Sequence, residues 1–247
     1  MFKKAYKINH KAIKKSLFIA LIIAFSISCS QNNAEIHWEV YDNALSYNDA
    51  STAIMALHQI KALEPYNEEV NDTLANIYFK AGMYQSSLKI AKEVLSSKPN
   101  HLKITLIAGE SANKLGAVDQ AIEYYEKWLT QNPEDIAVLY STAVNYFSLN
   151  QNSKEKPHSG KIKEYLGKIV SLPQSREIGL PFAVNESQNQ LISYYGAALN
   201  VLGYLKMEEG SYQEAKNYFD EALKNDPEFS LAKNNRTLLN QLISRNG

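Results

Sequence analysis

The sequence predicts an all-α protein, a right-handed α-solenoid of about five helix-turn-helix repeats with a capping helix at its C-terminal end. Three observations lead to this prediction. Pro65, Pro99 and Pro133 follow one another at intervals of 34 residues. Apolar residues recur at helical spacing between them, and small residues stand at matching places in the blocks. A period of this length indicates stacked helical hairpins, none of which can bury its apolar faces alone.

The first 28 residues have the composition of a secretory signal. Six lysines and no acidic residue precede or flank the apolar stretch of residues 17–27. This stretch is too short for a bilayer core, which needs about 20 residues, but it suits the apolar region of a signal peptide. Cys29, the only cysteine of the chain, follows Ser26-Ile27-Ser28, so no internal disulfide can form.

This arrangement resembles a bacterial lipoprotein signal, in which the cysteine becomes the first residue and carries acyl chains. The resemblance implies a signal peptide over residues 1–28, lipidation at Cys29 and a short lipid-anchored tether over residues 29–33. Ser26 departs from the leucine that the lipoprotein pattern prefers, so a soluble periplasmic product is the alternative. Ser30 stands where inner-membrane retention signals carry aspartate, which favours an outer-membrane lipoprotein facing the periplasm.

The charge of the remaining chain argues against nucleic acid as a partner. The whole sequence has 26 basic and 26 acidic residues, and the first 28 residues hold six of the lysines and none of the acids. Subtracting them leaves 20 basic against 26 acidic residues. Neutralisation of phosphates requires a basic face, which this balance does not favour.

The expected helix pairs occupy residues 34–67, 68–101, 102–135, 136–173 and 187–227. The last block is the most regular: Gly203, Ala215 and Ala222 are small, Phe219 is aromatic, and Pro227 ends the block. These features resemble the tetratricopeptide repeat, whose pattern places small residues at positions 8, 20 and 27, aromatics at 11 and 24, and proline at 32. Small residues let neighbouring helices approach closely, whereas aromatic residues fill the wedges between them.

The other blocks keep the pattern less completely. The second has Leu74, Ala75, Tyr78, Gly82 and Tyr84 at family positions, and the third has Gly109, Gly116, Ala121 and Tyr125. The first keeps Ala53 and Pro65. The fourth is six residues longer than the period, and the surplus falls in residues 150–160, whose proline, glycine and serine content indicates a loop.

The register is lost between Pro173 and Gly196. A helix start is expected at residues 185–187, so that a lengthened helix would run from about 187 to 209, after a loop or a short helix near residues 175–179. Residues 228–247 are expected to form the capping helix, because Leu231, Leu238, Leu239 and Leu242 share one face.

We expect no catalytic activity, no cofactor and no metal. The five histidines are scattered, and none has the spacing of a metal or catalytic motif. His37 and His58 could approach each other across the first helix pair, but ordinary surface histidines are favoured over a zinc site.

The resemblance to tetratricopeptide repeats implies a concave face that is lined by the first helix of each pair and binds a partner. Carried onto this chain, the residues of that face are Trp38, Glu39, Asp42, Asp72, Asn76, Phe79, Ile107, Glu110, Tyr140, Phe147 and Tyr204. The set is acidic toward the N-terminus and aromatic further along, which suits a protein segment with basic and apolar side chains. Several of the aromatic residues could instead pack within the stack.

The expected function is therefore a non-catalytic scaffold or adaptor in the bacterial cell envelope, which binds a protein or peptide and acts in the assembly of an envelope complex. The alternative is a lipoprotein that binds a glycan or small ligand, with Trp38, Tyr140 and Tyr204 as stacking platforms. Self-association through an incompletely capped first repeat is a further alternative.

Overall fold

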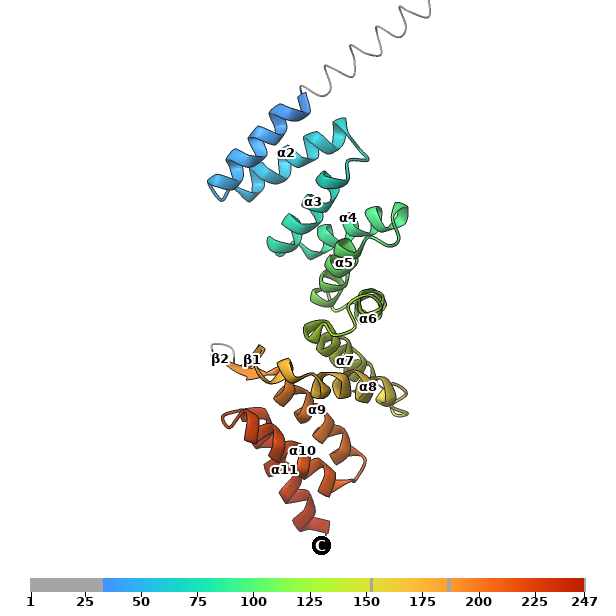
Figure 1. The fold of residues 1–247 in the computed structure, drawn as a ribbon, viewed down its shortest axis with the longest axis vertical. Helices are drawn as coiled ribbons and strands as arrows, with labels where there is room; N and C mark the ends of the chain where they lie inside the picture. Colours follow the sequence, from blue (N-terminus) through green and yellow to red (C-terminus); the bar gives the residue numbers. More distant parts are fainter. Residues whose placement is uncertain (1–32, 152, 186–187, 247) are drawn as a thin grey trace, which may run out of the picture. The chain divides into compact units, whose positions relative to one another are not determined.

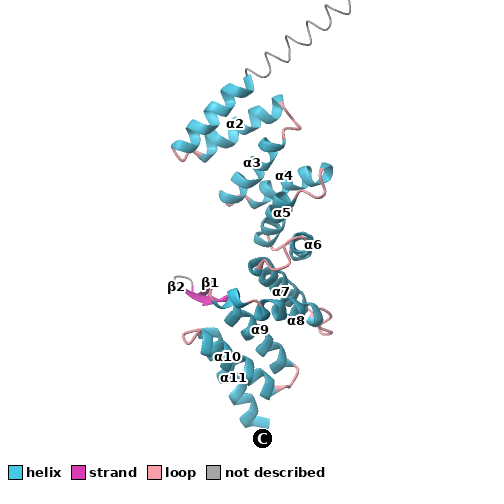
Figure 2. Ribbon diagram, viewed as in Figure 1, coloured by secondary structure: helices cyan, strands magenta, loops and turns pink. Residues whose placement is uncertain are grey.

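The computed structural model describes residues 33–151, 153–185 and 188–246 (Figure 1). They are helical except for turns, loops and one two-stranded hairpin (Figure 2). The proposed signal peptide and Cys29 lie outside the described residues. Within the described residues, no helix combines the length and the apolar character needed to cross a bilayer. The chain divides into two compact units, one ending at Pro99 and one beginning at Asn100, and each is described by itself.

The first unit contains a helix over residues 33–46, followed by α2 (Ala50–Leu63), α3 (Glu68–Lys80) and α4 (Tyr84–Ser97). Side chains cap the N-terminal ends of α2 and α3. Asp49 accepts a hydrogen bond from the Thr52 amide at the start of α2, and Asn67 accepts one from the Val70 amide at the start of α3. α3 packs against both α2 and α4. The core of this unit consists of apolar residues at helical spacing, among them Leu57, Ile60, Val70, Leu74 and Ala91.

The second unit holds seven α-helices, one 3-10 helix and one hairpin of the described chain. They are α5 (Leu102–Lys114), α6 (Val118–Leu129), α7 (Ile136–Gln151), α8 (Ser159–Ser171), the 3-10 helix η1 (Pro173–Arg176), β1 (Gly179–Asn185), β2 (Gln188–Ser193), α9 (Tyr194–Glu208), α10 (Tyr212–Asn225) and α11 (Ser230–Asn246). From α5 to α11 each α-helix packs on the next one along the chain. In addition, α9 contacts both α7 and α11, so the first helices of the last two pairs and the capping helix are neighbours.

The small residues lie where helices cross, as the sequence predicts. A Cβ atom added at Gly203 on α9 would stand 2.7 Å from the Phe219 ring on α10. One added at Gly109 on α5 would stand 2.9 Å from the Tyr125 ring on α6. Ala215 and Ala222 are completely buried. Small residues and aromatic rings therefore set the distance between paired helices, and the all-α repeat fold is confirmed.

Glycine also closes the tight turns within the helix pairs. Gly82 and Gly210 have φ angles of 73° and 75°, in the left-handed region that side-chain-bearing residues rarely adopt. They follow α3 and α9 and let the chain reverse into α4 and α10 within a few residues.

The segment before α9 corrects one expectation. The predicted helix start at residues 185–187 is wrong, because β1 and β2 form an antiparallel hairpin and α9 begins at Tyr194. Its cap is Ser193, whose Oγ accepts a hydrogen bond from the Gly196 amide at 2.9 Å. Before the hairpin, where the sequence predicts a loop or a short helix near residues 175–179, the structure has a short 3-10 helix, η1, which ends at Arg176.

The hairpin has one buried face and one open face. Leu180 and Phe182 pack on a cluster that contains Ile192, and the Phe182 ring lies 5.3 Å from the Phe229 ring. Leu191 points the other way and is 73% exposed. It stands opposite Pro181, a residue without an amide hydrogen. Leu191 thus belongs to the open face of a strand and not to the apolar face of a helix.

The connection between α7 and α8 falls within residues 150–160, where the sequence predicts a loop. Asn150 at the end of α7 holds it closed: its Oδ1 accepts from the His158 amide at 2.9 Å, and its Nδ2 donates to Ser159 Oγ at 3.1 Å. At the C-terminal end, α11 covers α10 and α9, with Ala232 and Leu239 completely buried.

Candidate functional site

A pocket of about 230 Å³ lies among the first helices of two successive pairs and the capping helix in the second unit. Its wall comes from α7, α9 and α11, and the lining residues are Phe147, Gln151, Asn200, Val201, Tyr204, Leu231 and Asn235. Two of these, Phe147 and Tyr204, belong to the predicted partner-binding set. None of the lining residues carries a charge.

The pocket combines an aromatic pair with an amide pair. The rings of Phe147 and Tyr204 meet edge to face, with centroids 5.7 Å apart. Asn200 is buried, and its Oδ1 accepts a hydrogen bond from Asn235 Nδ2 at 2.9 Å. This bond fixes the Asn200 side chain against α11, because a buried amide is stable only when its polar atoms are paired. The pocket is therefore an apolar cavity with oriented amide groups.

A second aromatic pair joins the N-terminal ends of α7 and α9. The rings of Tyr140 and Tyr194 meet edge to face at 5.6 Å. Burial raises the pKa of Tyr140 to about 12. Tyr140, a predicted binding residue, is thus packed against a neighbouring helix, and its ring is not a free stacking platform.

Acidic groups stand near this second pair. Burial raises the pKa of the Tyr194 phenol, and the charges of Asp135 and Glu110 raise it further. Burial also raises the pKa of Glu110, whereas Tyr125 and Lys114 oppose that rise. Asp135 is held in place by the Trp128 indole, which donates to its Oδ2 at 2.9 Å, and by the Val138 amide. Ile107, also predicted for the binding face, is buried on α5.

The predicted residues of the first unit lie on the helix of residues 33–46 and on α3. The Trp38 ring meets Tyr41 edge to face at 5.5 Å, and the Phe79 ring lies 5.6 Å from Tyr84. Glu39 and Asp42 are exposed, and Asp72 and Asn76 are half-buried. The pKa of Tyr41 is raised by burial and then by the nearby charges of Asp42 and Glu69. Acidic and aromatic side chains therefore also adjoin in this unit.

Sequence reasoning missed part of the pocket wall. Gln151, Val201, Leu231 and Asn235 line the pocket but were not among the predicted binding residues. Leu231 and Asn235 come from α11, whose helical pattern indicates a cap and gives no sign of a binding role. Tyr194 was likewise assigned to the interior of a helix, whereas it is the first residue of α9.

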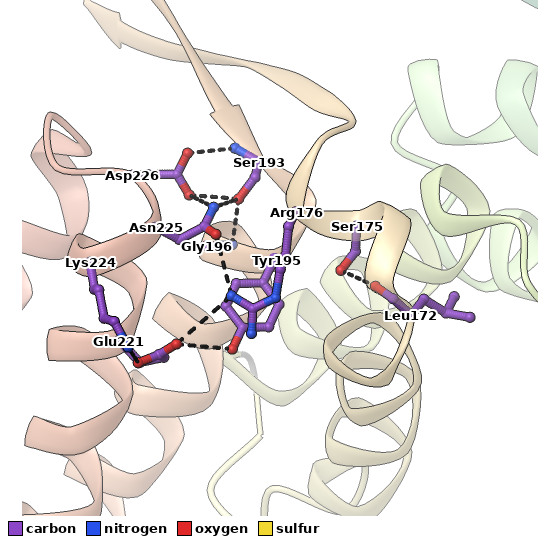
Figure 3. Close-up of polar contacts among 10 residues, drawn as sticks. All are labelled: Leu172, Ser175, Arg176, Ser193, Tyr195, Gly196, Glu221, Lys224, Asn225 and Asp226. Carbon is purple, nitrogen blue, oxygen red and sulfur yellow. Dashed lines mark hydrogen bonds and ion pairs between the residues drawn. The ribbon is translucent and has the colours of Figure 1, made fainter.

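A polar network fixes the hairpin to the start of α9 (Figure 3). The Ser193 amide donates to Asp226 Oδ1 at 2.9 Å, and Ser193 Oγ donates to Asp226 Oδ2 at 2.6 Å. The Arg176 guanidinium lies 3.5 Å from the centre of the Tyr195 ring and forms an ion pair with Glu221 at 3.8 Å. We call this set, with Asn225, the hairpin latch. It joins η1, β2 and the end of α10, which is a structural role.

No metal-binding group of three or more His, Cys, Asp or Glu side chains is found in the part of the chain that the structure describes. His58, considered above for zinc, is instead in contact with Tyr78: its Nε2 lies 2.6 Å from the phenol oxygen. Burial lowers the pKa of His58, which favours the neutral ring.

Comparisons with known proteins agree with the repeat fold. Residues 43–128 match the family described as anaphase-promoting complex, cyclosome, subunit 3, and residues 196–229 match the tetratricopeptide repeat. No curated protein matches the sequence. Together with the fold, these two segments support a likeness to tetratricopeptide-repeat proteins.

Solved structures with similar folds include three tetratricopeptide-type chains. A tetratricopeptide repeat protein from Parabacteroides merdae has a TM-score of 0.60 at 20% identity, over 87% of this chain and 75% of that one. MamA protein has a TM-score of 0.61 at 17% identity, over 80% and 93%. MamA from Desulfovibrio magneticus RS-1 has a TM-score of 0.58 at 16% identity, over 80% and 97%. At these identities the likeness concerns the fold alone.

Proposed function

We propose that this protein is a non-catalytic scaffold or adaptor of the bacterial cell envelope, which holds a segment of a protein partner against α7, α9 and α11. In this proposal Cys29 carries the lipid anchor, and the protein faces the periplasm from the outer membrane, where it serves the assembly of an envelope complex. The single observation that carries the binding role is the uncharged pocket among the neighbouring helices α7, α9 and α11.

The pocket suits one large apolar side chain of the partner. Burial of a leucine- or phenylalanine-sized side chain contributes about 1.5–3 kcal/mol, and such anchors dominate the affinity of protein interfaces. Amide groups at Gln151 and Asn235 can pair with the backbone of the same segment. Glu110 and Asp135, near the Tyr140–Tyr194 pair, favour a basic residue elsewhere in it.

A glycan or small ligand is the alternative occupant. Three residues were considered as stacking platforms. The Trp38 ring already contacts Tyr41, and the Tyr140 ring already contacts Tyr194. Tyr204 lines the pocket, so a sugar ring would have to stack there. The experiment below separates the two occupants.

We test the binding role with Val201→Arg, which puts a long charged side chain into the pocket wall. Thr237→Arg is the matched control, because Thr237 is an exposed residue of α11 outside the pocket. The unaltered protein is purified after crosslinking in cells, and a stoichiometric partner is identified. We expect Val201→Arg to weaken its binding at least about tenfold, near 1.4 kcal/mol, and Thr237→Arg to leave it unchanged.

If the two variants bind the partner equally well, the pocket is not part of the interface. Recovery of no protein partner, together with calorimetric binding of an oligosaccharide that Val201→Arg abolishes, would replace the scaffold by the glycan alternative. Circular dichroism of both variants verifies that the helices are intact.

A further inference from the structure

Two positions on the first helix of each repeat are buried in four of the five blocks. The repeats are counted from residues 34, 68, 102 and 136 and, in the last block, from Gly196, where its match to the repeat pattern begins. The third residue is then Val70, Ile104, Val138 or Ala198, and the seventh is Leu74, Ala108, Thr142 or Leu202. All eight are at most 8% exposed. These positions therefore form the face on which each repeat is covered by other parts of the protein.

The first repeat leaves the same face open. Its third and seventh residues are Ile36 and Val40, which are 52% and 36% exposed. They stand four residues apart on the helix of residues 33–46 and so lie one above the other. We call Ile36 and Val40 the open face. An apolar face that is covered in every other repeat indicates that something covers it here as well.

The outer surface of α11, the last described helix, is mainly polar. Exposed residues of α11 include the polar side chains of Lys233, Asn234, Thr237, Asn240, Gln241 and Ser244. The buried residues Ala232 and Leu239 face the preceding helices. A polar outer surface is what a terminal repeat requires for solubility. The two strongly exposed apolar residues of α11, Leu238 at 44% and Ile243 at 41%, stand five positions apart and so lie on different sides of the helix, unlike Ile36 and Val40.

We propose that the open face lies against the membrane surface, with Ile36 and Val40 inserted among the lipid headgroups beside the anchor. This inference rests on the proposed acylation of Cys29. Three residues separate Cys29 from Asn33, the first described residue, and the four Cα-to-Cα steps between them span at most about 14 Å. The anchored helix is thus confined near the bilayer, where aliphatic side chains are stabilised at the boundary between headgroups and acyl chains.

Charge disfavours a symmetric pair of copies as the occupant. The helix of residues 33–46 carries Glu35, Glu39 and Asp42 and no lysine or arginine. A two-fold contact through this helix would bring two sets of these carboxylates together. At the membrane the contact relies on burial of the aliphatic side chains, and a zwitterionic headgroup surface does not repel the acids in this way.

The test places a photoreactive residue on the open face of the full-length protein in intact cells. The variants are Ile36→p-benzoylphenylalanine and, as a matched control, Met83→p-benzoylphenylalanine, because Met83 is a 47% exposed apolar residue of the same unit. After irradiation, mass spectrometry identifies what is attached to each probe. The mass of the peptide that contains Cys29 reports acylation in the same samples.

We expect adducts of phospholipid mass at the Ile36 position, several-fold more abundant than at the Met83 position. Adducts that join two copies, or another protein, at Ile36 would overturn the inference, and so would equal lipid adducts at both positions. If Cys29 is acylated and Ile36 gains no lipid, the inference fails while the anchor stands. An unmodified Cys29 overturns the anchor in the proposed function and the inference with it.

Discussion

At the scale of single residues, the contact between Gly203 and Phe219 shows how side-chain volume sets helix spacing. The Phe219 ring is completely buried, and its nearest carbon would stand 2.7 Å from a Cβ at Gly203. Real Cβ atoms do not come so close, so either the ring or the helix has to move when a methyl group is added. Both are held by close packing, which makes such movement unfavourable.

We therefore expect Gly203→Ala to lower the free energy of unfolding by about 1–3 kcal/mol, as overpacking of a core does. Gly167→Ala is the control, because Gly167 lies inside α8 and an added Cβ there meets no atom within 4 Å. That change should raise the free energy of unfolding by up to about 1 kcal/mol, since alanine favours the helix. Urea unfolding followed by circular dichroism measures both. Effects of the same sign would contradict the proposed close contact.

Much of this residue-level pattern could be predicted from the sequence. Gly109, Gly203 and Ala222 were expected at crossings because helix geometry converts sequence spacing into contact, and volume then decides which residues fit. The wall of the pocket could be predicted only in part. Phe147 and Tyr204 follow the repeat pattern, whereas Asn235 lies on α11, and its bond to Asn200 joins residues 35 positions apart.

At the scale of elements, the hairpin latch decides where α9 begins. Ser193 caps the helix while its amide and hydroxyl donate to Asp226, at the end of α10. Each hydrogen bond to a charged group contributes about 1.5–3 kcal/mol, less where water has access. The cap and the hairpin are thus stabilised by a residue 33 positions further along the chain.

We expect Asp226→Ala to open the hairpin locally and to lower the free energy of unfolding by about 2 kcal/mol. Hydrogen exchange read by mass spectrometry should show faster exchange in residues 179–193, with α5 and α6 unaffected. Glu228→Ala serves as control, because the Glu228 side chain is 86% exposed and its carboxylate pairs with Lys233 at the surface. Unchanged exchange of the hairpin in Asp226→Ala would show that its apolar face alone holds it.

The same latch explains why the hairpin could not be predicted. The helices of 12 to 17 residues repeat their apolar pattern over three or more turns. The strands have seven and six residues, and Leu191 continues the helical spacing of Tyr194, Tyr195 and Ala198. A short strand with that spacing is indistinguishable from a helix until its distant partners, here Asp226 and Phe229, are known.

At the scale of the whole molecule, helices within each unit pack mainly on their neighbours along the chain. The last helix of a unit therefore affects stability more than its length suggests. α11 covers clusters that contain Phe219, Ala222 and Met207, and it contributes Leu239 and Ala232 to them. It also supplies Leu231 and Asn235 to the pocket. Stability and binding in the second unit therefore depend on the same terminal helix.

A chain that ends at Pro227 should accordingly lose cooperative unfolding of the second unit and associate in solution. The buried side chains of Phe229 and Leu239 each contribute about 1.5–3 kcal/mol, and their loss also exposes Phe219 and Ala222 to water. Calorimetry and light scattering measure the two effects. A chain that ends at Ile243, which lacks only the residues after it, should behave as the full protein does. A monomeric, fully stable chain ending at Pro227 would show that α11 is dispensable.

The proline in the hairpin bears on the solubility of the protein. A two-stranded ribbon exposes two edges to which strands from other molecules could add, a known route to fibrous aggregates. Pro181 stands within β1 and lacks the amide hydrogen that such an added strand would need. In a crowded compartment, a strand from an adjacent molecule would therefore lack one hydrogen bond at this edge. This protects the protein from forming extended intermolecular sheets.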